Sequence, residues 1–230
     1  MAERPILFSG PMVRAILEGR KTVTRRIVKT QPPEGTTHYT PNWVHNFVHG
    51  YFVPMKGSST NDLERWGDGA ILCPYGDAGD ILWVKETFFA WGEWTVSFDQ
   101  SKGRDVWSFV DRTVETGRKY GYAADGAADY TRPREAGRLL WWKRPTLFMP
   151  RSACRITLER AATSVGRAQG LSPEDAPAEG VPGDAPSQEG RDQLRDAWRK
   201  LWTRINGEQS WTSNPWVWVV AFRRTSGGAQ

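Results

Sequence analysis

A basic segment near the N-terminus, Gly19-Arg20-Lys21-Thr22-Val23-Thr24-Arg25-Arg26, combines an amine, two hydroxyls and several guanidinium groups. A threonine hydroxyl such as that of Thr24 is a useful nucleophile only when a nearby base takes its proton. Lys21 can be that base if burial or neighbouring cations lower its pKa. Arg26 can hold a phosphate or stabilise an oxyanion. The segment therefore predicts anion binding or activation of a hydroxyl.

The spacing of these residues sets a geometric condition. In an extended strand, residues 21 and 24 point to opposite faces. Lys21 can therefore serve Thr24 only from a turn that precedes the strand, whereas Thr22, Thr24 and Arg26 share one face. The same pattern also fits a solvated basic strand whose threonines reflect strand propensity. Spacing alone leaves both interpretations open.

A second segment, Leu171–Val181, carries acidic residues in a turn-rich context. Ser172 and Asp175 fit a capping box with Pro173 at the first helical position. Glu179 directly precedes a glycine that ends this short element. A carboxylate at such a position can orient a lysine or move a proton, and a solvated surface turn explains it equally well.

Hydrophobic periodicity predicts the elements that must position these residues. A helix opens at Gly10-Pro11 and closes at Gly19. Strands are expected at 22–28, 81–88, 154–159 and 216–222, and a further helix at 192–205. The last strand is apolar on both faces, which indicates the centre of a sheet. The whole predicts an α+β fold, a small β-barrel of five to six strands with about three flanking helices.

Three segments interrupt this pattern. Residues of about 31–70 and 91–140 are rich in glycine and proline or in charge, and they predict two irregular insertions, the second with one or two hairpins. Residues of about 182–190 read as a flexible linker. His45 and His49 in the first insertion have the spacing of a helical metal pair, but no cysteine or carboxylate cluster supports them, so no metal site and no cofactor is predicted.

The composition of the 230 residues gives information on the kinds of molecule that the protein can bind and on its cellular compartment. The formal charge of +5 mildly favours polyanions. Thirteen tryptophans favour core packing and also permit base stacking. Cys73 and Cys154 are isolated in sequence, which indicates free thiols in a reducing compartment. No signal peptide or membrane-spanning segment is recognised, so we expect a cytoplasmic protein without a membrane partner.

Three segments taken in order resemble the ASCH domain of the PUA-like superfamily: Ala15–Arg26, Gly79–Phe88 and Glu174–Gly180. Two further stretches, Arg144–Arg151 and Trp211–Phe222, are similar to the longer phage-encoded members. The resemblance implies one ASCH/PUA-like domain over residues 1–230, with a small β-barrel around a cleft. It would place the protein in the host cytoplasm if it is phage-encoded.

The resemblance also implies a chemistry. Small members of the family hydrolyse the amide of N(4)-acetylcytidine without metal, using a lysine, a threonine and a glutamate. Carried over by position, the catalytic set would be Lys21, Thr24 and Glu179, and Arg26, Arg25 and Thr22 would contact the substrate.

Two function classes stay open at this level. The first is a metal-independent amidohydrolase acting on an acylated cytosine base or nucleoside. The second is a binding module that holds a modified nucleotide or a single strand, RNA more than DNA, in the same basic cleft without catalysis. An accessory or assembly factor without chemistry has only the large insertions in its favour.

Overall fold

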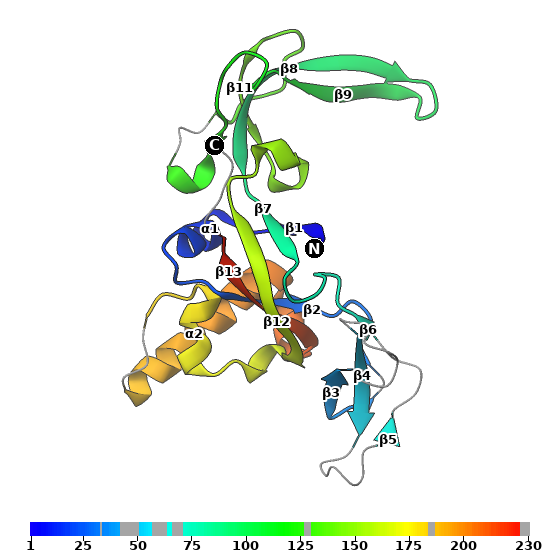
Figure 1. The fold of residues 1–230 in the computed structure, drawn as a ribbon. Helices are drawn as coiled ribbons and strands as arrows, with labels where there is room; N and C mark the ends of the chain where they lie inside the picture. Colours follow the sequence, from blue (N-terminus) through cyan, green and yellow to red (C-terminus); the bar gives the residue numbers. More distant parts are fainter. Residues whose placement is uncertain are drawn as a thin grey trace. The chain divides into compact units, whose positions relative to one another are not determined.

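The structure is a computed structural model that describes residues 1–32, 34–41, 51–56, 64–65, 71–126, 130–183 and 187–225. The single domain expected over residues 1–230 divides into two compact units. The first unit combines Met1–Arg4, Ala15–Leu82 and the described chain from Thr157 onward, and the second combines Pro5–Arg14 with Trp83–Ile156. Strands and helices both contribute, so the chain has the α+β character that the sequence predicts (Figure 1).

The largest sheet has the strand order β1-β7-β12-β13-β2. These strands span Glu3–Leu7 (β1), Ile81–Lys85 (β7), Thr157–Arg167 (β12), Trp216–Arg224 (β13) and Val23–Ile27 (β2). β13 pairs antiparallel with both β12 and β2, which confirms the interior position predicted from its apolar run. In the described residues this order is open, ending at β1 and β2, and no closed barrel is detected.

Two helices have the boundaries that local sequence signals favour. Helix α1 spans Gly10–Leu17, and Gly19 adopts a left-handed φ of 75° just beyond it. Helix α2 spans Gln188–Asn206 and begins where the side chain of Ser187 accepts a hydrogen bond from Gly190 N–H. The last three residues of the expected linker 182–190 are therefore helical, because Ser187 caps the helix earlier than hydrophobic periodicity alone indicates.

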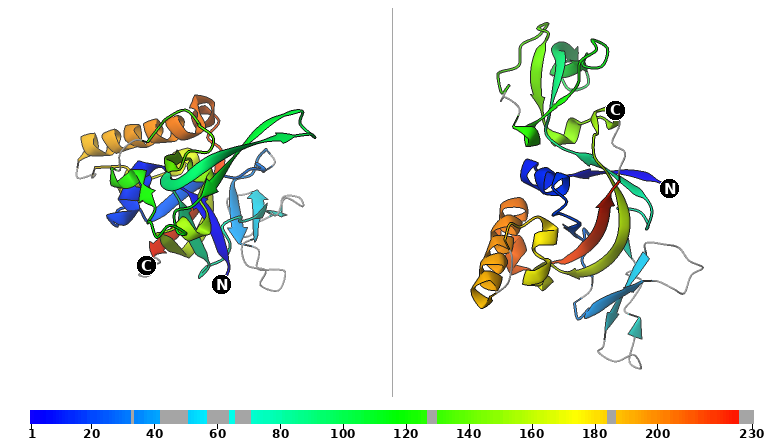
Figure 2. Two further views of the ribbon diagram at one scale, coloured as in Figure 1. Left: turned by 90° about the horizontal axis from the view of Figure 1, so that it is seen from above. Right: turned by 60° about the vertical axis from the view of Figure 1, so that its left-hand side comes forward.

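Helix α2 covers the core of the first unit. Leu194, Trp198 and Trp202 face inward at the spacing of one helical stripe and pack with Val217 of β13. Figure 2 shows α2 beside the short helical segments that precede it in the chain. These are three 3-10 turns, Ala168–Gly170 (η4), Pro173–Asp175 (η5) and Pro177–Glu179 (η6). The short helix α3 (Glu208–Thr212) follows α2.

The insertion expected at 31–70 is not wholly irregular. It contains strands β3 (His38–Pro41), β4 (Tyr51–Lys56) and β5 (Glu64–Arg65), which pair with each other and, through β4, with β6 (Ile71–Leu72). Periodicity did not reveal these strands because each is short, two to six residues, and glycines and prolines lie among them. His45 and His49, the pair weighed as metal ligands, lie outside the described residues.

The second unit is built on the twelve-residue strand β8 (Phe88–Asp99). The first part of β8 pairs with β10 (Gly121–Tyr122) and β11 (Leu140–Arg144), and the remainder forms a hairpin with β9 (Arg104–Asp111). The hairpin expected within 91–140 is thereby confirmed, and Figure 1 shows it extending away from β11. Short 3-10 turns complete the unit: Ala123–Asp125 (η1), Thr146–Phe148 (η2) and Arg151–Ala153 (η3).

None of the helices in the described ranges combines the length and the apolar character that a membrane crossing requires.

Candidate functional site

Lys21 lies in the turn between α1 and β2. The backbone N–H groups of Arg20 and Lys21 both donate to Ala15 O, at 2.9 and 3.0 Å, which closes the helix and turns the chain. β2 begins only at Val23, so Lys21 precedes the strand. The lysine therefore has the placement that the sequence argument requires for a side chain that folds back across the strand.

Glu179 reaches the same place from the far end of the sequence. Ser172 Oγ accepts a hydrogen bond from Asp175 N–H and caps η5, as predicted. Gly180 ends η6 with a left-handed φ of 87°. Thr22 N–H then donates to Ala178 O at 2.9 Å and fixes this turn against the start of β2.

The two side chains meet in the interior of the first unit. Lys21 Nζ donates to Glu179 Oε2 at 3.2 Å and to Glu179 O and Val23 O at 2.7 Å each. The side chains of Lys21 and Glu179 are 0% and 2% exposed. These three acceptors match the three N–H donors of an ammonium group, so the lysine is held firmly in one position.

Arg25 completes a group that we call the Lys21 cluster: Lys21, Arg25 and Glu179. The guanidinium Nη1 of Arg25 donates to Glu179 Oε1 at 2.8 Å, and its backbone N–H donates to Oε2 at 3.3 Å. Both carboxylate oxygens thus have charged partners, as a buried carboxylate requires. Within the described part of the chain, Arg25 Nε is buried without a hydrogen-bond acceptor.

The electrostatics of the site follow from this burial. Removal from water lowers the pKa of the Lys21 ammonium, the Glu179 carboxylate opposes this shift, and the Arg26 and Arg25 charges add to it. Burial also lowers the pKa of Arg26, which interacts with Tyr75 and Glu179. A lysine whose charged form is disfavoured is closer to the neutral amine that a base must be.

Thr24 lies within β2, opposite Val220 of β13, and is 2% exposed. Within the described residues, no hydrogen bond links its hydroxyl to Lys21 or to Glu179. Thr22, expected on the same face, is exposed. The structure therefore brings Lys21, Arg25 and Glu179 into contact and leaves Thr24 buried in β2, the strand that also carries Arg25, without a hydrogen bond to Lys21 or Glu179 in the described residues.

Two contributors to this site are missed by sequence reasoning. Gly180 packs so closely that a Cβ added there would lie 3.2 Å from Lys21 Cδ. The glycine directly after Glu179 was the available signal, since a left-handed residue beside a candidate carboxylate marks a tight turn. Tyr75, the neighbour of Arg26, comes from the loop after β6 and carries no such signal.

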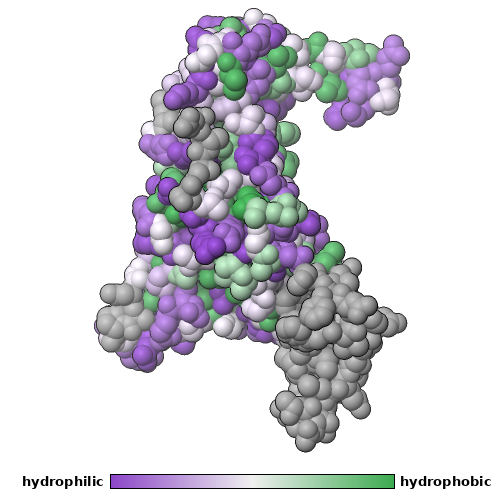
Figure 3. Space-filling view, in the orientation of Figure 1, coloured by the Kyte–Doolittle hydropathy of each residue, from purple (hydrophilic) through white to green (hydrophobic). Residues whose placement is uncertain are grey.

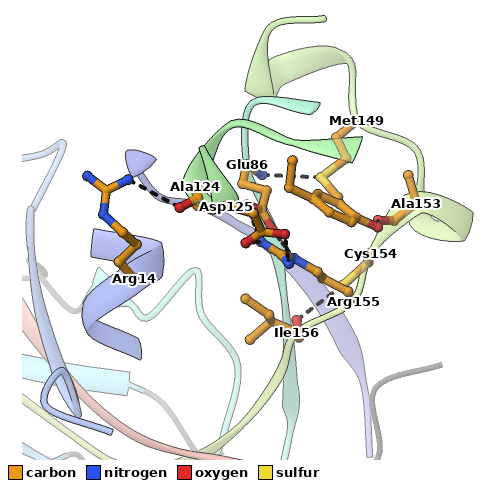
Figure 4. Close-up of polar contacts among 10 residues, drawn as sticks. Arg14, Glu86, Ala124, Asp125, Met149, Ala153, Cys154, Arg155 and Ile156 are labelled. Atoms are coloured by element: carbon orange, nitrogen blue, oxygen red, sulfur yellow. Dashed lines mark hydrogen bonds and ion pairs between the residues drawn. The ribbon is translucent and has the colours of Figure 1, made fainter. Parts of the chain in front are cut away.

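A second buried carboxylate lies in the other unit. Glu86, directly after β7, is bound by Arg155 through Nε–Oε1 and Nη2–Oε2 contacts of 2.8 and 3.1 Å. Arg155 also pairs with Asp125, at 2.6 and 2.9 Å, and its guanidinium lies 3.9 Å from the centre of the Tyr122 ring (Figure 4). We call Glu86, Asp125 and Arg155 the Glu86 cluster.

The Glu86 cluster contains buried charged groups, but no reactive nucleophile is found beside them among the described residues. Burial raises the pKa of Glu86, and Arg155 opposes the shift. Among the side chains drawn in Figure 4, the nearby thiol is that of Cys154, whose Sγ donates to Ile156 O at 3.1 Å and whose pKa burial raises. Such a thiol is a poor nucleophile. We therefore interpret the Glu86 cluster as a structural ion-pair network.

Comparison of the chain with models of protein families, with curated proteins and with solved structures gives no match.

Proposed function

We propose that the protein is a metal-independent amidohydrolase that acts on an acylated cytosine base or nucleoside, such as N(4)-acetylcytidine. The observation that carries the proposal is the 3.2 Å contact between Lys21 Nζ and Glu179 Oε2, formed by residues 158 positions apart and buried from water. A desolvated lysine held by a carboxylate is a recognised way to obtain a base near neutral pH.

In the proposed reaction, Thr24 Oγ attacks the amide carbonyl while the neutral Lys21 amine takes the hydroxyl proton. Arg26 stabilises the oxyanion of the tetrahedral intermediate. Collapse of the intermediate breaks the carbon–nitrogen bond, and Lys21 returns the proton to the leaving amine. Water then cleaves the acyl-threonine ester, which releases the carboxylic acid and restores the hydroxyl.

Two of the hydrogen bonds of Lys21 can persist when its amine is neutral. A neutral amine keeps two N–H donors, and two carbonyl oxygens, those of Val23 and Glu179, lie at 2.7 Å from Nζ. Deprotonation then weakens the longer contact, which is the one to the carboxylate. The Glu179 carboxylate keeps its two hydrogen bonds from Arg25, which hold it in place.

Substrate access needs a movement, because Lys21, Thr24 and Glu179 are all buried. Thr22 is exposed and Arg26 is half-buried, whereas the side chain of Arg25 is only 9% exposed, so Thr22 and Arg26 form the part of the site that a substrate meets first. An amide or phosphate oxygen that reaches the buried Nε of Arg25 would satisfy a donor that lacks an acceptor among the described residues.

The ASCH/PUA-like assignment belongs to the same proposal. Its support is the placement of the segments that carry the resemblance: β2, β7 and β13 are strands of one sheet, and the Glu174–Gly180 segment is fixed to the start of β2. A barrel of this family would close that sheet around the Lys21 cluster.

The test is release of acetate from N(4)-acetylcytosine and N(4)-acetylcytidine by the full-length protein. Thr24→Val, which keeps the shape and removes the hydroxyl, should lower kcat/KM about 10³-fold or more, and so should Lys21→Met. Thr24→Ser should retain measurable activity, and Lys200→Met, on the exposed face of α2, should match the wild type. A wild-type protein that leaves both compounds intact would rule out this substrate class.

The binding-module alternative has its own supporting observation. Lys21 already uses three donors within the protein, and Thr24 has no hydrogen bond to the cluster in the described residues. If the Lys21 cluster only shapes a basic cleft, Arg25→Gln and Arg26→Gln should weaken nucleotide binding while Thr24→Val leaves it unchanged. Acetate release that disappears in Thr24→Val would contradict that alternative.

A further inference from the structure

The second unit contains a groove of about 730 Å³ whose lining includes no residue of the Lys21 cluster or of the Glu86 cluster. We call it the arginine groove. Its walls come from β8, β9, β11 and the segments that follow them, and they consist mainly of aromatic rings and cations: Trp94, Trp107, Phe109, Tyr130, Arg132, Arg134, Trp142, Lys143, Arg144 and Phe148. A volume of this size is within the usual range of small-molecule and nucleotide sites.

The arginines of the groove lie over its rings. The guanidinium carbons of Arg134 and Arg144 are 4.6 and 4.7 Å from the centre of the Trp94 ring. Arg144 is also 4.3 Å from the centre of Phe109, and Arg132 is 5.6 Å from that of Trp142. A guanidinium group over an aromatic ring at these distances is attracted to the face of the ring.

Three arginines of the groove, Arg132, Arg134 and Arg144, lie among aromatic rings, and the Asp111 carboxylate acts electrostatically on Arg144. In the part of the chain that the structure describes, Arg132, Arg134 and Arg144 form no ion pair with a carboxylate, and the groove has no acidic residue in its lining. Burial lowers the pKa of Arg144, and the charge of Arg134 lowers it further. An anion bound here would relieve this repulsion.

The apolar wall of the groove continues onto the β8–β9 hairpin. Directly opposed residues of two strands share a face. The register therefore extends one face from Trp94 and Phe109 to Val96 and Trp107, and then to Phe98. Trp107 is 37% exposed, and Val96 and Phe98 are also exposed. Figure 3 shows apolar residues along this hairpin at the upper right, among hydrophilic neighbours.

A further observation points to an absent ligand. Trp94 is almost entirely buried, and its indole Nε1 has no hydrogen-bond acceptor among the described residues. A buried indole N–H normally has a partner, and a ligand oxygen or a water in the groove would supply one.

From these contacts we propose that the arginine groove binds single-stranded nucleic acid. Phosphates lie on Arg132, Arg134 and Arg144, and unpaired bases stack on the exposed rings of Trp107 and Phe148, which is 59% exposed. An acidic peptide would use the cations and leave the rings uncovered, and a paired duplex would hide the base faces from them. The site uses no residue of the Lys21 cluster, so this proposal and the amidohydrolase proposal can fail separately.

The test is fluorescence anisotropy with labelled 12-nucleotide oligo-U and oligo-dT. A hairpin duplex, a mononucleotide and an oligoglutamate peptide serve as competitors. The single strands should bind with a strong dependence on salt, and the competitors should displace them poorly. Equal binding of the duplex or of the mononucleotide, or efficient displacement by oligoglutamate, would overturn the proposal, as would absence of strand binding at low salt.

Substitutions of groove residues test whether the single strand binds in the arginine groove. Arg132 and Arg134 are both exposed, so the double variant R132Q/R134Q should fold normally, weaken binding at least about tenfold and flatten the salt dependence. Trp107→Ala should weaken binding about 5- to 100-fold, and Trp107→Phe much less.

The matched control is Arg118→Gln. Arg118 also stacks on a tryptophan, with its guanidinium carbon 4.3 Å from the centre of Trp91, but it does not line the groove. Binding by this variant should stay within about twofold of the wild type. Equal losses in Arg118→Gln and in R132Q/R134Q would mean that general positive charge, rather than the groove, holds the strand.

Discussion

Two buried carboxylates, Glu179 in the first unit and Glu86 in the second, are both bound by an arginine, yet their surroundings differ. Glu86 shares Arg155 with Asp125, and the cation reaches partly into solvent. Glu179 shares its oxygens between Arg25 and Lys21, and the lysine side chain is fully enclosed. The first arrangement neutralises a buried acid. In the Lys21 cluster, the buried Glu179 carboxylate holds the Lys21 ammonium, whose charged form is disfavoured by burial.

The comparison teaches how a candidate site differs from a structural ion pair. A perturbed pKa appears in both clusters: that of Glu86 is raised and that of Lys21 is lowered, each mainly by burial. Of the two clusters, the Lys21 cluster is the one that includes a residue next in sequence to a buried threonine, Thr24 of β2. A perturbed pKa alone therefore does not distinguish a functional site from a structural ion pair. The presence of a possible nucleophile nearby is the additional criterion.

The largest expected difference between the two clusters is in catalysis. Glu179→Gln should lower kcat for acetate release about 10²- to 10⁴-fold, because a carboxylate that orients a base is lost. Glu86→Gln should leave kcat unchanged and lower the free energy of unfolding by about 1–3 kcal/mol. Kinetics and urea unfolding of both variants measure this contrast. Equal kcat values for the two variants would remove the functional distinction between the clusters.

The next difference concerns the glycine beside each cluster. Gly180 and Gly126 both have left-handed φ angles, 87° and 76°, so alanine should cost about 1–2 kcal/mol at either position. A Cβ at Gly126 would meet no atom within 4 Å, whereas one at Gly180 would press on Lys21 Cδ. Gly180→Ala should therefore be the more destabilising by about 1 kcal/mol and should also lower kcat.

Gly126→Ala is the matched control for this effect, because it carries the backbone strain without the contact. Thermal unfolding and acetate release are measured on both variants. If Gly180→Ala keeps full activity, the position of the Lys21 side chain does not matter for the reaction.

The pH dependence of stability should have opposite signs in the two clusters. The pKa of Lys21 is lowered in the folded protein, so between that value and the unfolded pKa near 10.4 the unfolded chain binds more protons, and stability rises with pH. The pKa of Glu86 is raised, so its contribution is fully present below the unfolded pKa near 4.3 and is lost as the pH rises through the folded pKa.

Urea unfolding of the wild type, Lys21→Met and Glu86→Gln over a range of pH isolates the two contributions. The stability of the wild type relative to Lys21→Met should increase toward alkaline pH, and its stability relative to Glu86→Gln should increase toward acidic pH. A slope of the other sign for Lys21 would mean that its pairing with Glu179 outweighs its burial.

The smallest expected effects come from the caps that hold the turns. Ser172→Ala removes the cap of η5, and Ser187→Ala removes that of α2. Each should cost about 0.5–1 kcal/mol in thermal unfolding. Ser172→Ala should also reduce acetate release a few-fold, since η5 leads into Glu179. Equal activity of the two variants would show that η6 holds Glu179 without help from η5.

Local signals in the sequence determined much of the first unit. Proline early and glycine late bounded α1, a serine three residues before a backbone donor capped η5, and an apolar run on both faces placed β13 inside its sheet. These features depend on residues close together in the chain, so they can be read without knowledge of the fold. The start of α2 was misjudged because its Ser187 cap lies before the apolar stripe begins, and the strands of the first insertion were missed because they are too short to show a period.

The tertiary structure alone decided which charges meet. The sequence marks Lys21 and Glu179 as candidates but does not show that Glu179, the last residue of η6, meets Lys21 in the turn before β2, with Gly180 packed against the lysine. It likewise gives no sign that Arg132, Arg134 and Arg144 gather over the rings of one groove. Burial, and with it the strength of every charge interaction, depends on which distant segments exclude water together, and that is a property of the folded chain.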